Sequence, residues 1–340
     1  MRVPPLYNLQ HFRGRHYLFP TALKVKREVL RAFGQKYGRA VNDEFFTAHL
    51  QKPMREVLRE STPDVIICFQ NASAKMLLCD LHVDIPVIII SHGDPVDLFH
   101  SHPQKELAAF ERCAVFQVLL PGFAARVQKY IPNVRIVSIG NVVPQYEEQA
   151  DLRREKEKYK IVFIGRMVRN HKRPHLLIEA FIKIAAEFPD WRLELWGAED
   201  NKRYQKDLQT MIDEAGLTER ILFCGTTTDV PAVLADADLC VAPSAYEGFS
   251  LAHTAAKSMG LPLIGYKNCV SVNELVHDGV NGLLADDGAE ALAEKMAILM
   301  RNRDLRVRMG TAARASMRAY APEIIWGQWE ALMEKLVDSQ

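Results

Sequence analysis

The chain has 340 residues, 48% of them hydrophobic, and a formal net charge of +1 at pH 7. A chain of this length is long for one hydrophobic core and sufficient for two, so we expect two domains. We expect no nucleic-acid partner. The longest aliphatic run, residues 87–90, is far shorter than the ~20 residues of a membrane-spanning helix, and the first residues lack the pattern of an export signal. We therefore expect a cytoplasmic protein. Its six scattered cysteines form no C-x-x-C pair, which favours reduced thiols over disulfides or zinc.

Positive charge is concentrated at the start of the chain, because residues 1–55 contain eleven Lys or Arg and only three Asp or Glu, a balance of +8. One predicted helix there has an apolar face and a polar, mostly basic face. The apolar face holds Ala22, Val25, Val29, Phe33 and Tyr37, and the opposite face holds Lys24, Arg27, Arg31 and Gln35. Two interpretations stay open: peripheral contact with an anionic membrane or anionic glycan, or a helix packed by its apolar face.

Apolar strands alternate with helices through the rest of the first half, which is typical of a parallel sheet. The predicted strands are 64–69, 86–91, 116–120 and 135–139, with helices at 72–81, 104–113 and 123–130. Residues 147–158 are charged and have almost no aliphatic pattern, so we predict a linker there. The alternation resumes at residue 159. The predicted domains are thus 1–146 and 159–321, followed by a last helix within 322–340.

The most informative segment is residues 244–251, between a buried strand (238–243) and a small-residue helix (253–259). The unpaired N–H groups and positive dipole end of a helix start can hold an anion. Glu247 lies at the edge of that turn, where its carboxylate can accept hydrogen bonds from sugar hydroxyls. Together these features favour a nucleotide-sugar site. The alternative is an ordinary strand-to-helix turn with a surface glutamate.

Segments on either side of this turn carry a family resemblance. They are residues 160–166, 171–174, 191–197, 221–225, 247–249 and 273–282. Because these segments occur in the order typical of that family, the chain resembles the retaining glycosyltransferases of family 4. The resemblance implies an α/β GT-B fold of two facing Rossmann-like domains, with an N-terminal acceptor-binding domain and a C-terminal nucleotide-sugar domain. It also implies a final helix that crosses back to the N-terminal domain.

The resemblance assigns catalytic roles to four residues. Arg166 and Lys172 follow a predicted strand end, where open α/β sheets bind ligands, and would stabilise the charge that grows on the leaving diphosphate. Glu247 would contact the hydroxyls of the donor sugar. His92, at a strand end of the other domain, would face the donor. The implied donor-binding set is Gly165, Gly197, Thr226, Gly248, Phe249, Ser250 and Leu251.

Two departures from the family matter. The family usually has a second Glu eight residues after the first, and this chain has Ala255 there. In relatives that carboxylate is taken to hold the ribose of the donor, and we expect the Ala255 face of the helix to border an open crevice. Family members also begin with a strand and a Gly-rich loop, for which residues 12–15 are the one weak match. Either the first βα unit is cryptic, or the chain begins later than its relatives.

No metal is expected. Asp236 and Asp238 superficially match the Asp-x-Asp motif of metal-dependent transferases, but they lie before a buried strand, so we interpret them as a solvated turn. The sequence therefore predicts a retaining, metal-independent glycosyltransferase that moves a sugar from a UDP- or GDP-sugar to a glycan or lipid-linked acceptor in bacterial surface-polysaccharide synthesis. The alternatives are a non-catalytic partner or glycan-binding relative, and an epimerase or phosphorylase on the same fold.

Overall fold

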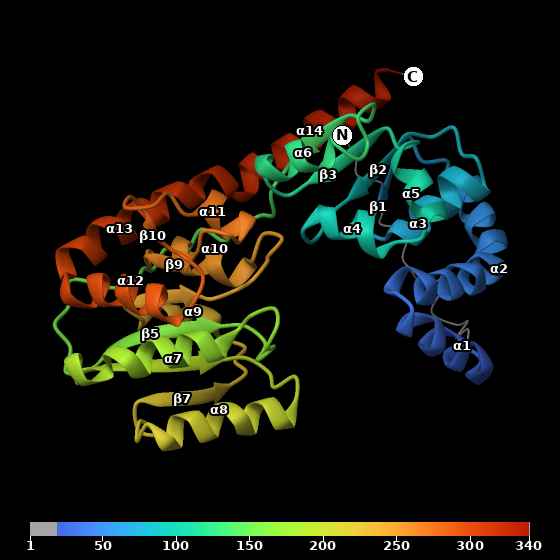
Figure 1. The fold of residues 1–340 in the computed structure, drawn as a ribbon. Coiled ribbons are helices and arrows are strands. Elements are labelled where there is room, and N and C mark those ends of the chain that lie inside the picture. The colour runs from blue at the N-terminus through green and yellow to red at the C-terminus, as the bar shows by residue number, and fades with distance from the viewer. Residues whose placement is uncertain (1–18, 340) are drawn as a thin grey trace. The chain divides into compact units, whose positions relative to one another are not determined.

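The computed structural model describes residues 19–339, which divide into two compact units. The first unit contains the chain up to Ile139 together with the segment from Glu330, and the second runs from Gly140 to Trp329. Each unit is built around a parallel β-sheet (Figure 1). Within the described part of the chain, every helix is too short or too polar to span a bilayer.

The sheet of the first unit has four parallel strands in the order β1-β2-β3-β4. They are β1 (Ile66–Cys68), β2 (Val87–Ile90), β3 (Val115–Val118) and β4 (Ile136–Ser138). Each falls on a predicted strand. Every residue of β2 and β3 is buried, as expected for strands covered on both faces.

The helices of the first unit include two that the sequence analysis missed, one over most of residues 35–61 and one over residues 95–101. The helices are α1 (Thr21–Ala32), α2 (Gln35–Ser61), α3 (Asn71–Lys75), continued by a π-helical turn (Met76–Asp80), α4 (Pro95–Ser101), α5 (Gln104–Phe110) and α6 (Pro121–Val127). The start of α4 is capped by Asp94, whose carboxylate accepts a hydrogen bond from the Val96 N–H at 3.0 Å. Between residues 19 and 65 the chain forms α1 and α2 and no strand. The weak loop match at residues 12–15 lies outside the described residues.

The predicted basic helix is interrupted at Gly34, whose φ of +144° is a conformation that side chains rarely allow. Helix α1 therefore ends before this glycine and α2 begins after it. No residue of α1 is buried, and Val25, Val29 and Phe33 are 59%, 57% and 76% exposed. The predicted apolar face is thus exposed in the structure, although α1 packs against α2 through other residues.

The second unit has six parallel strands in the order β10-β9-β8-β5-β6-β7. They are β5 (Tyr159–Ile164), β6 (Trp191–Trp196), β7 (Ile221–Gly225), β8 (Leu239–Ala242), β9 (Leu263–Tyr266) and β10 (Gly282–Ala285). The strand order reverses between the neighbours β5 and β8. Such a reversal creates a crevice at the carboxyl ends of the strands, where ligands bind in open α/β sheets.

Helices cover both faces of this second sheet. They are α7 (Pro174–Ile184), α8 (Lys202–Glu214), α9 (Val230–Ala235), α10 (Leu251–Ser258), α11 (Val270–Leu275), α12 (Ala289–Arg301) and α13 (Arg303–Ser316). Neighbouring residues of β5 point to opposite sides. Phe163 packs in a core with α7, and Val162 packs in a separate core with α10. The helices that follow β5 and β8 therefore lie on opposite faces of the sheet.

The predicted linker and the last helix complete the fold. Residues 147–158 have no helix or strand, but Ala150 and Leu152 are buried in the core of the second unit, so this segment is packed. The units divide earlier, between Ile139 and Gly140. The last helix, α14 (Pro322–Val337), contributes its first half to the second unit and its residues from Glu330 onward to the first.

Candidate active site

Glycines form the carboxyl edge of three neighbouring strands in the second unit. The Gly165 N–H donates to the Trp196 carbonyl at 2.9 Å, and the Gly197 N–H donates to the Gly225 carbonyl at 2.7 Å. A Cβ atom on Gly197 would lie only 2.0 Å from the Gly165 carbonyl oxygen, and its φ is +149°. Glycine is required at 197 by this close approach. The Lys172 side chain lies beside Gly165, since a Cβ atom there would be 3.4 Å from Lys172 Cδ.

An ion pair crosses the point where the strand order reverses. Lys172 follows β5 and Glu247 follows β8, and Lys172 Nζ contacts Glu247 Oε1. The side chains are only 14% and 7% exposed. Two bonds hold the loops together: the Ala245 N–H donates to the His171 carbonyl at 2.8 Å, and Arg173 Nε donates to the Pro243 carbonyl at 2.8 Å. The structure thus brings together two residues that the sequence analysis singled out 75 positions apart.

Backbone strain lies on both sides of this ion pair. Arg173 and Ser250 have φ values of +49° and +44°, in the left-handed region that non-glycine residues seldom occupy. They are the cap residues that begin α7 and α10. Such strain persists only where surrounding contacts impose it, and it is frequent at binding sites. Both helix starts thus belong to the same strained edge.

Two histidines complete the surroundings of Glu247. His171 Nε2 lies 3.8 Å from Glu247 Oε2, and its ring stacks on Tyr246 with 4.3 Å between centroids. His253, in the first turn of α10, is 2% exposed. The sequence analysis missed both as site residues. The available signal was that His171 begins the family segment 171–174 and that His253 closely follows the turn at residues 244–251.

Electrostatics keep Glu247 ionised. Burial alone would favour the neutral acid. Attraction from His253, which carries charge only in the acidic range near pH 4, and from Lys172, together with the hydrogen bond from Lys172, outweighs burial, so the pKa of Glu247 lies below its ordinary value. Burial lowers the pKa of His253 to about 4, so this imidazole is neutral at pH 7. Lys172 is then the cation that balances Glu247 at neutral pH, and the carboxylate is suited to accepting hydrogen bonds.

The other predicted residues of the second unit are placed differently. Arg166 is 65% exposed and lies 3.8 Å from Asp200, and its charge adds to the burial that lowers the pKa of His171. Thr226 is exposed at the end of β7, and Leu251 is 59% exposed at the start of α10. The Phe249 ring is buried against Tyr320, with 5.0 Å between centroids. Only the backbone of Phe249, with that of Gly248 and Ser250, is therefore available at the turn.

The expectation for Ala255 is wrong. This residue is 7% exposed and packs in a core that includes Ala256 and Met259. Every residue from His253 to Ser258 is buried, because α10 is covered by the sheet and by α13. A carboxylate at position 255 would enter this core, and not an open crevice.

The Asp-x-Asp segment lies at the opposite edge of the sheet. Asp236 and Asp238 precede β8, whereas Glu247 follows it. Asp238 is 1% exposed, 3.1 Å from Lys156 Nζ, and accepts a hydrogen bond from the Lys160 N–H at 2.8 Å. Asp236 pairs with Lys160. The solvated-turn interpretation is therefore wrong for Asp238, which is buried. No three His, Cys, Asp or Glu side chains within residues 19–339 are arranged to hold a metal.

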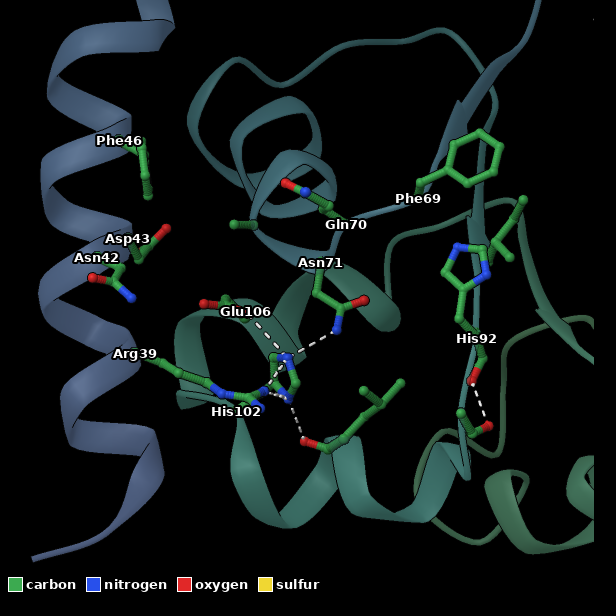
Figure 2. Close-up of a pocket in the computed structure, with 15 residues that line it drawn as sticks. Arg39, Asn42, Asp43, Phe46, Phe69, Gln70, Asn71, His92, His102 and Glu106 are labelled. Carbon is green, nitrogen blue, oxygen red and sulfur yellow. Dashed lines mark hydrogen bonds and ion pairs between the residues drawn. The ribbon is translucent and has the colours of Figure 1, made fainter. Parts of the chain in front are cut away.

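His92 belongs to the first unit. It follows β2, is exposed, and stacks on Phe69 with 5.5 Å between ring centroids. Both rings line a pocket of that unit (Figure 2).

Solved structures define the class of this fold. Sucrose-phosphate synthase from Thermosynechococcus elongatus matches with a TM-score of 0.74 and 18% identity, over 88% of this chain and 79% of that one. S. aureus TarM, solved with UDP and other ligands, matches with a TM-score of 0.68 and 22% identity, over 79% of this chain and 55% of that one. The fold is the GT-B fold of glycosyltransferases.

Residues 144–316, about half of the chain, match the family described as "Glycosyl transferases group 1". The chain belongs to this family.

Relatives of known sequence agree with this assignment. Over 261 residues the chain is 26% identical to N-acetyl-alpha-D-glucosaminyl L-malate synthase of Bacillus anthracis, covering 73% of this chain and 67% of the relative. It is 29% identical over 206 residues to exopolysaccharide phosphotransferase SCO2592 of Streptomyces coelicolor, covering 60% and 21%. It is 25% identical over 184 residues to poly(glycerol-phosphate) alpha-glucosyltransferase of Bacillus subtilis, covering 54% and 27%. The chain spans well under half of the length of the last two relatives.

Proposed function

We propose that this chain is a retaining, metal-independent glycosyltransferase that moves a sugar from a UDP- or GDP-sugar to a glycan or lipid-linked acceptor in the synthesis of a bacterial surface polysaccharide. The observation that carries the proposal is the Lys172–Glu247 pair at the strand-order reversal of the second sheet. The names of the relatives, which include a poly(glycerol-phosphate) alpha-glucosyltransferase, support the class of reaction.

The charges at this edge fit departure of a nucleoside diphosphate. Breaking the sugar–phosphate bond places extra negative charge on the leaving group, which Lys172 and the N–H groups that begin α10 can stabilise. Because Arg166 is exposed, its guanidinium can bind phosphate oxygens without breaking a buried interaction. Glu247 accepts hydrogen bonds from the hydroxyls of the donor sugar. The acceptor hydroxyl attacks from the side of the leaving group and passes its proton to the departing phosphate.

The same charges support metal independence. The cations Lys172 and Arg166 supply at this edge the positive charge that a divalent ion supplies in other transferases. The carboxylates of Asp236 and Asp238 are engaged by lysines at the opposite edge of the sheet. EDTA should leave turnover intact. A strict requirement for Mg²⁺ or Mn²⁺ would overturn this part of the proposal.

Donor hydrolysis tests the activity without knowledge of the acceptor. The full chain is incubated with UDP-glucose, UDP-N-acetylglucosamine and GDP-mannose, and release of UDP or GDP is measured. Slow release from one donor, abolished by Lys172→Met, is expected. The melting temperature of the chain is also measured with each donor. If no donor is hydrolysed and none raises the melting temperature, the alternative of a non-catalytic partner or glycan-binding relative is favoured.

Helix α1 supports a membrane-linked acceptor. Its exposed Val25, Val29 and Phe33 lie beside the exposed bases Lys24 and Lys26. An apolar face bordered by basic residues is suited to the interface of an anionic leaflet. We propose that α1 docks the enzyme on the anionic cytoplasmic face of a membrane, where a lipid-linked acceptor is presented.

A further inference from the structure

The first unit contains a pocket of about 450 Å³ at the carboxyl ends of β1 and β2. Helix α2 forms one wall and carries Arg39, Asn42 and Phe46 (Figure 2). Asn71 and His102 lie across from α2, and Phe69 and His92 lie at the strand ends (Figure 2). Neither the ion pair of the second unit nor any residue assigned from the family motif, apart from His92, contributes to this pocket.

A polar network centred on His102 lines the floor. Its ring nitrogens lie 2.6 Å from Arg39 Nη1 and 3.0 Å from Asn71 Nδ2. Burial lowers the pKa of His102 to about 4, so the ring is neutral at pH 7. Arg39 has no carboxylate within ion-pair distance among residues 19–339. Its remaining guanidinium N–H groups, with the Asn71 and Asn42 amides, are therefore available as donors to a ligand.

The charges around the pocket oppose an anionic ligand. Asp43 lies 3.1 Å from Lys75, which also pairs with Asp80 at 2.8 Å, so one lysine serves two carboxylates. Glu106 is 4% exposed, and its pKa is raised to about 7 by burial and by Asp43. Among the charged side chains that line the pocket, Arg39 is offset by Asp43 and in part by Glu106. An anionic ligand therefore gains no net attraction there, and the two carboxyl groups oppose added negative charge.

Two aromatic side chains stand exposed at the rim. Phe69 is 63% exposed and rests on the His92 ring, and Phe46 is 40% exposed on α2. Exposed aromatic faces in a pocket lined by amides and acids provide an apolar surface beside hydrogen-bonding groups. A sugar ring has the matching character, because its C–H face is apolar and its hydroxyls both donate and accept hydrogen bonds.

We infer that this pocket binds an uncharged sugar ring of the acceptor, with its hydroxyls on Arg39, Asn71 and Asn42 and its C–H face on Phe69. The inference rests on the proposed transferase function and specifies the class of acceptor. Specificity for a neutral sugar over an anionic one arises from Asp43 and Glu106, which penalise added negative charge.

Saturation-transfer NMR on the full chain tests the pocket directly. The probes are methyl α-D-glucopyranoside, methyl α-D-galactopyranoside and methyl N-acetyl-α-D-glucosaminide, compared with D-glucuronate and glucose 1-phosphate. We expect signal from at least one neutral glycoside and none from the anions. Phe69→Ala should raise its Kd about 2- to 10-fold, and Arg39→Lys should also weaken binding, because it keeps the charge but loses the planar donors. The control is Trp326→Ala, which removes an exposed aromatic side chain of α14 outside the pocket and should leave glycoside binding unchanged.

Donor hydrolysis separates this inference from the proposed function. Donor hydrolysis without binding of any neutral glycoside, preferential binding of the anions, or equal binding by wild type and Phe69→Ala would overturn the pocket assignment alone. Glycoside binding that depends on Phe69, with no use of any donor, would overturn the transferase proposal and leave the pocket as a sugar-binding site.

Discussion

The two units build their polar sites from similar parallel sheets in different ways. In the second unit the strand order reverses between β5 and β8, so the helices that follow these strands leave toward opposite faces. The crevice is a product of topology, and the ion pair of Lys172 and Glu247 lies in it. In the first unit the four described strands run in sequence order without a reversal. There, α2 supplies the wall that encloses a pocket.

The chemistry of the two sites differs accordingly. The second unit keeps a lysine and a carboxylate together beside the glycines that end its strands, an arrangement that suits the proposed phosphate site. The first unit has a neutral imidazole, a partly protonated Glu106 and open aromatic faces. The comparison shows that similar parallel sheets can build a charged site through a reversal of strand order and a largely uncharged pocket through an added helix.

Substitution of Lys172 should have the largest effect on activity, because this residue supplies charge at the strand-order reversal that distinguishes the second unit from the first. Lys172→Met should lower donor turnover by about 10²–10³-fold, the range for loss of one group that stabilises transition-state charge. It also leaves Glu247 buried without its cation. The double variant Lys172→Met/Glu247→Gln should therefore recover stability while activity stays low. Near-normal turnover in either variant would mean that the phosphate site lies elsewhere. Lys183→Met, on an exposed pair of α7, is the control.

Glu106 should make the first unit sensitive to pH. Its ordinary pKa is 4.5 and its folded value is about 7, so between these values the folded chain binds more protons than the unfolded chain. The contribution of Glu106 to the free energy of unfolding is therefore fully present below about pH 4.5 and is lost as pH rises through 7. Relative to Glu106→Gln, wild type should lose roughly 3 kcal/mol of unfolding free energy by pH 8. Urea titrations of both proteins from pH 5 to 8 measure this; parallel curves would show that Glu106 is ionised throughout.

Ala255 tests whether the α10 face is closed. Ala255→Glu should lower the free energy of unfolding by about 1–3 kcal/mol, since a polar group would be buried without a partner. Ala252→Glu, at a half-buried position of the same helix, should cost less. Thermal unfolding with and without UDP compares them. If Ala255→Glu keeps wild-type stability and binds UDP more tightly, this face of α10 opens to the donor. Position 255 would then belong to the site of the second unit.

Helix α1 gives the smallest expected effect for each residue changed. The full chain should co-sediment with anionic phosphatidylserine vesicles more than with neutral phosphatidylcholine vesicles, and less as salt rises. Lys24→Gln and Lys26→Gln should each remove about 1 kcal/mol of binding. Equal binding to both vesicles, or none to either, would contradict membrane docking. Binding to an anionic polysaccharide but not to vesicles would assign the basic face to a glycan.

Local features of this protein are readable from its sequence. They include the strands of the first sheet, the glycines at positions 165 and 197, and the position of Lys172 and Glu247 after strand ends, because each depends on neighbours within a few residues. Turn glycines and strand-ending charges leave a pattern in the chain regardless of what packs beside them. The family motif gave the fold class for the same reason.

Contacts between residues far apart in the sequence depend on the tertiary structure. Lys172 and Glu247 pair because β5 and β8 are neighbours, a fact of strand order that no local pattern records. Burial of Ala255 and of the Phe249 ring depends on α13 and Tyr320, which lie far along the chain. The pocket of the first unit likewise needs α2 against two strand ends. Contacts between distant segments are set by packing of the whole unit, and that is why sequence periodicity could name these residues without placing them.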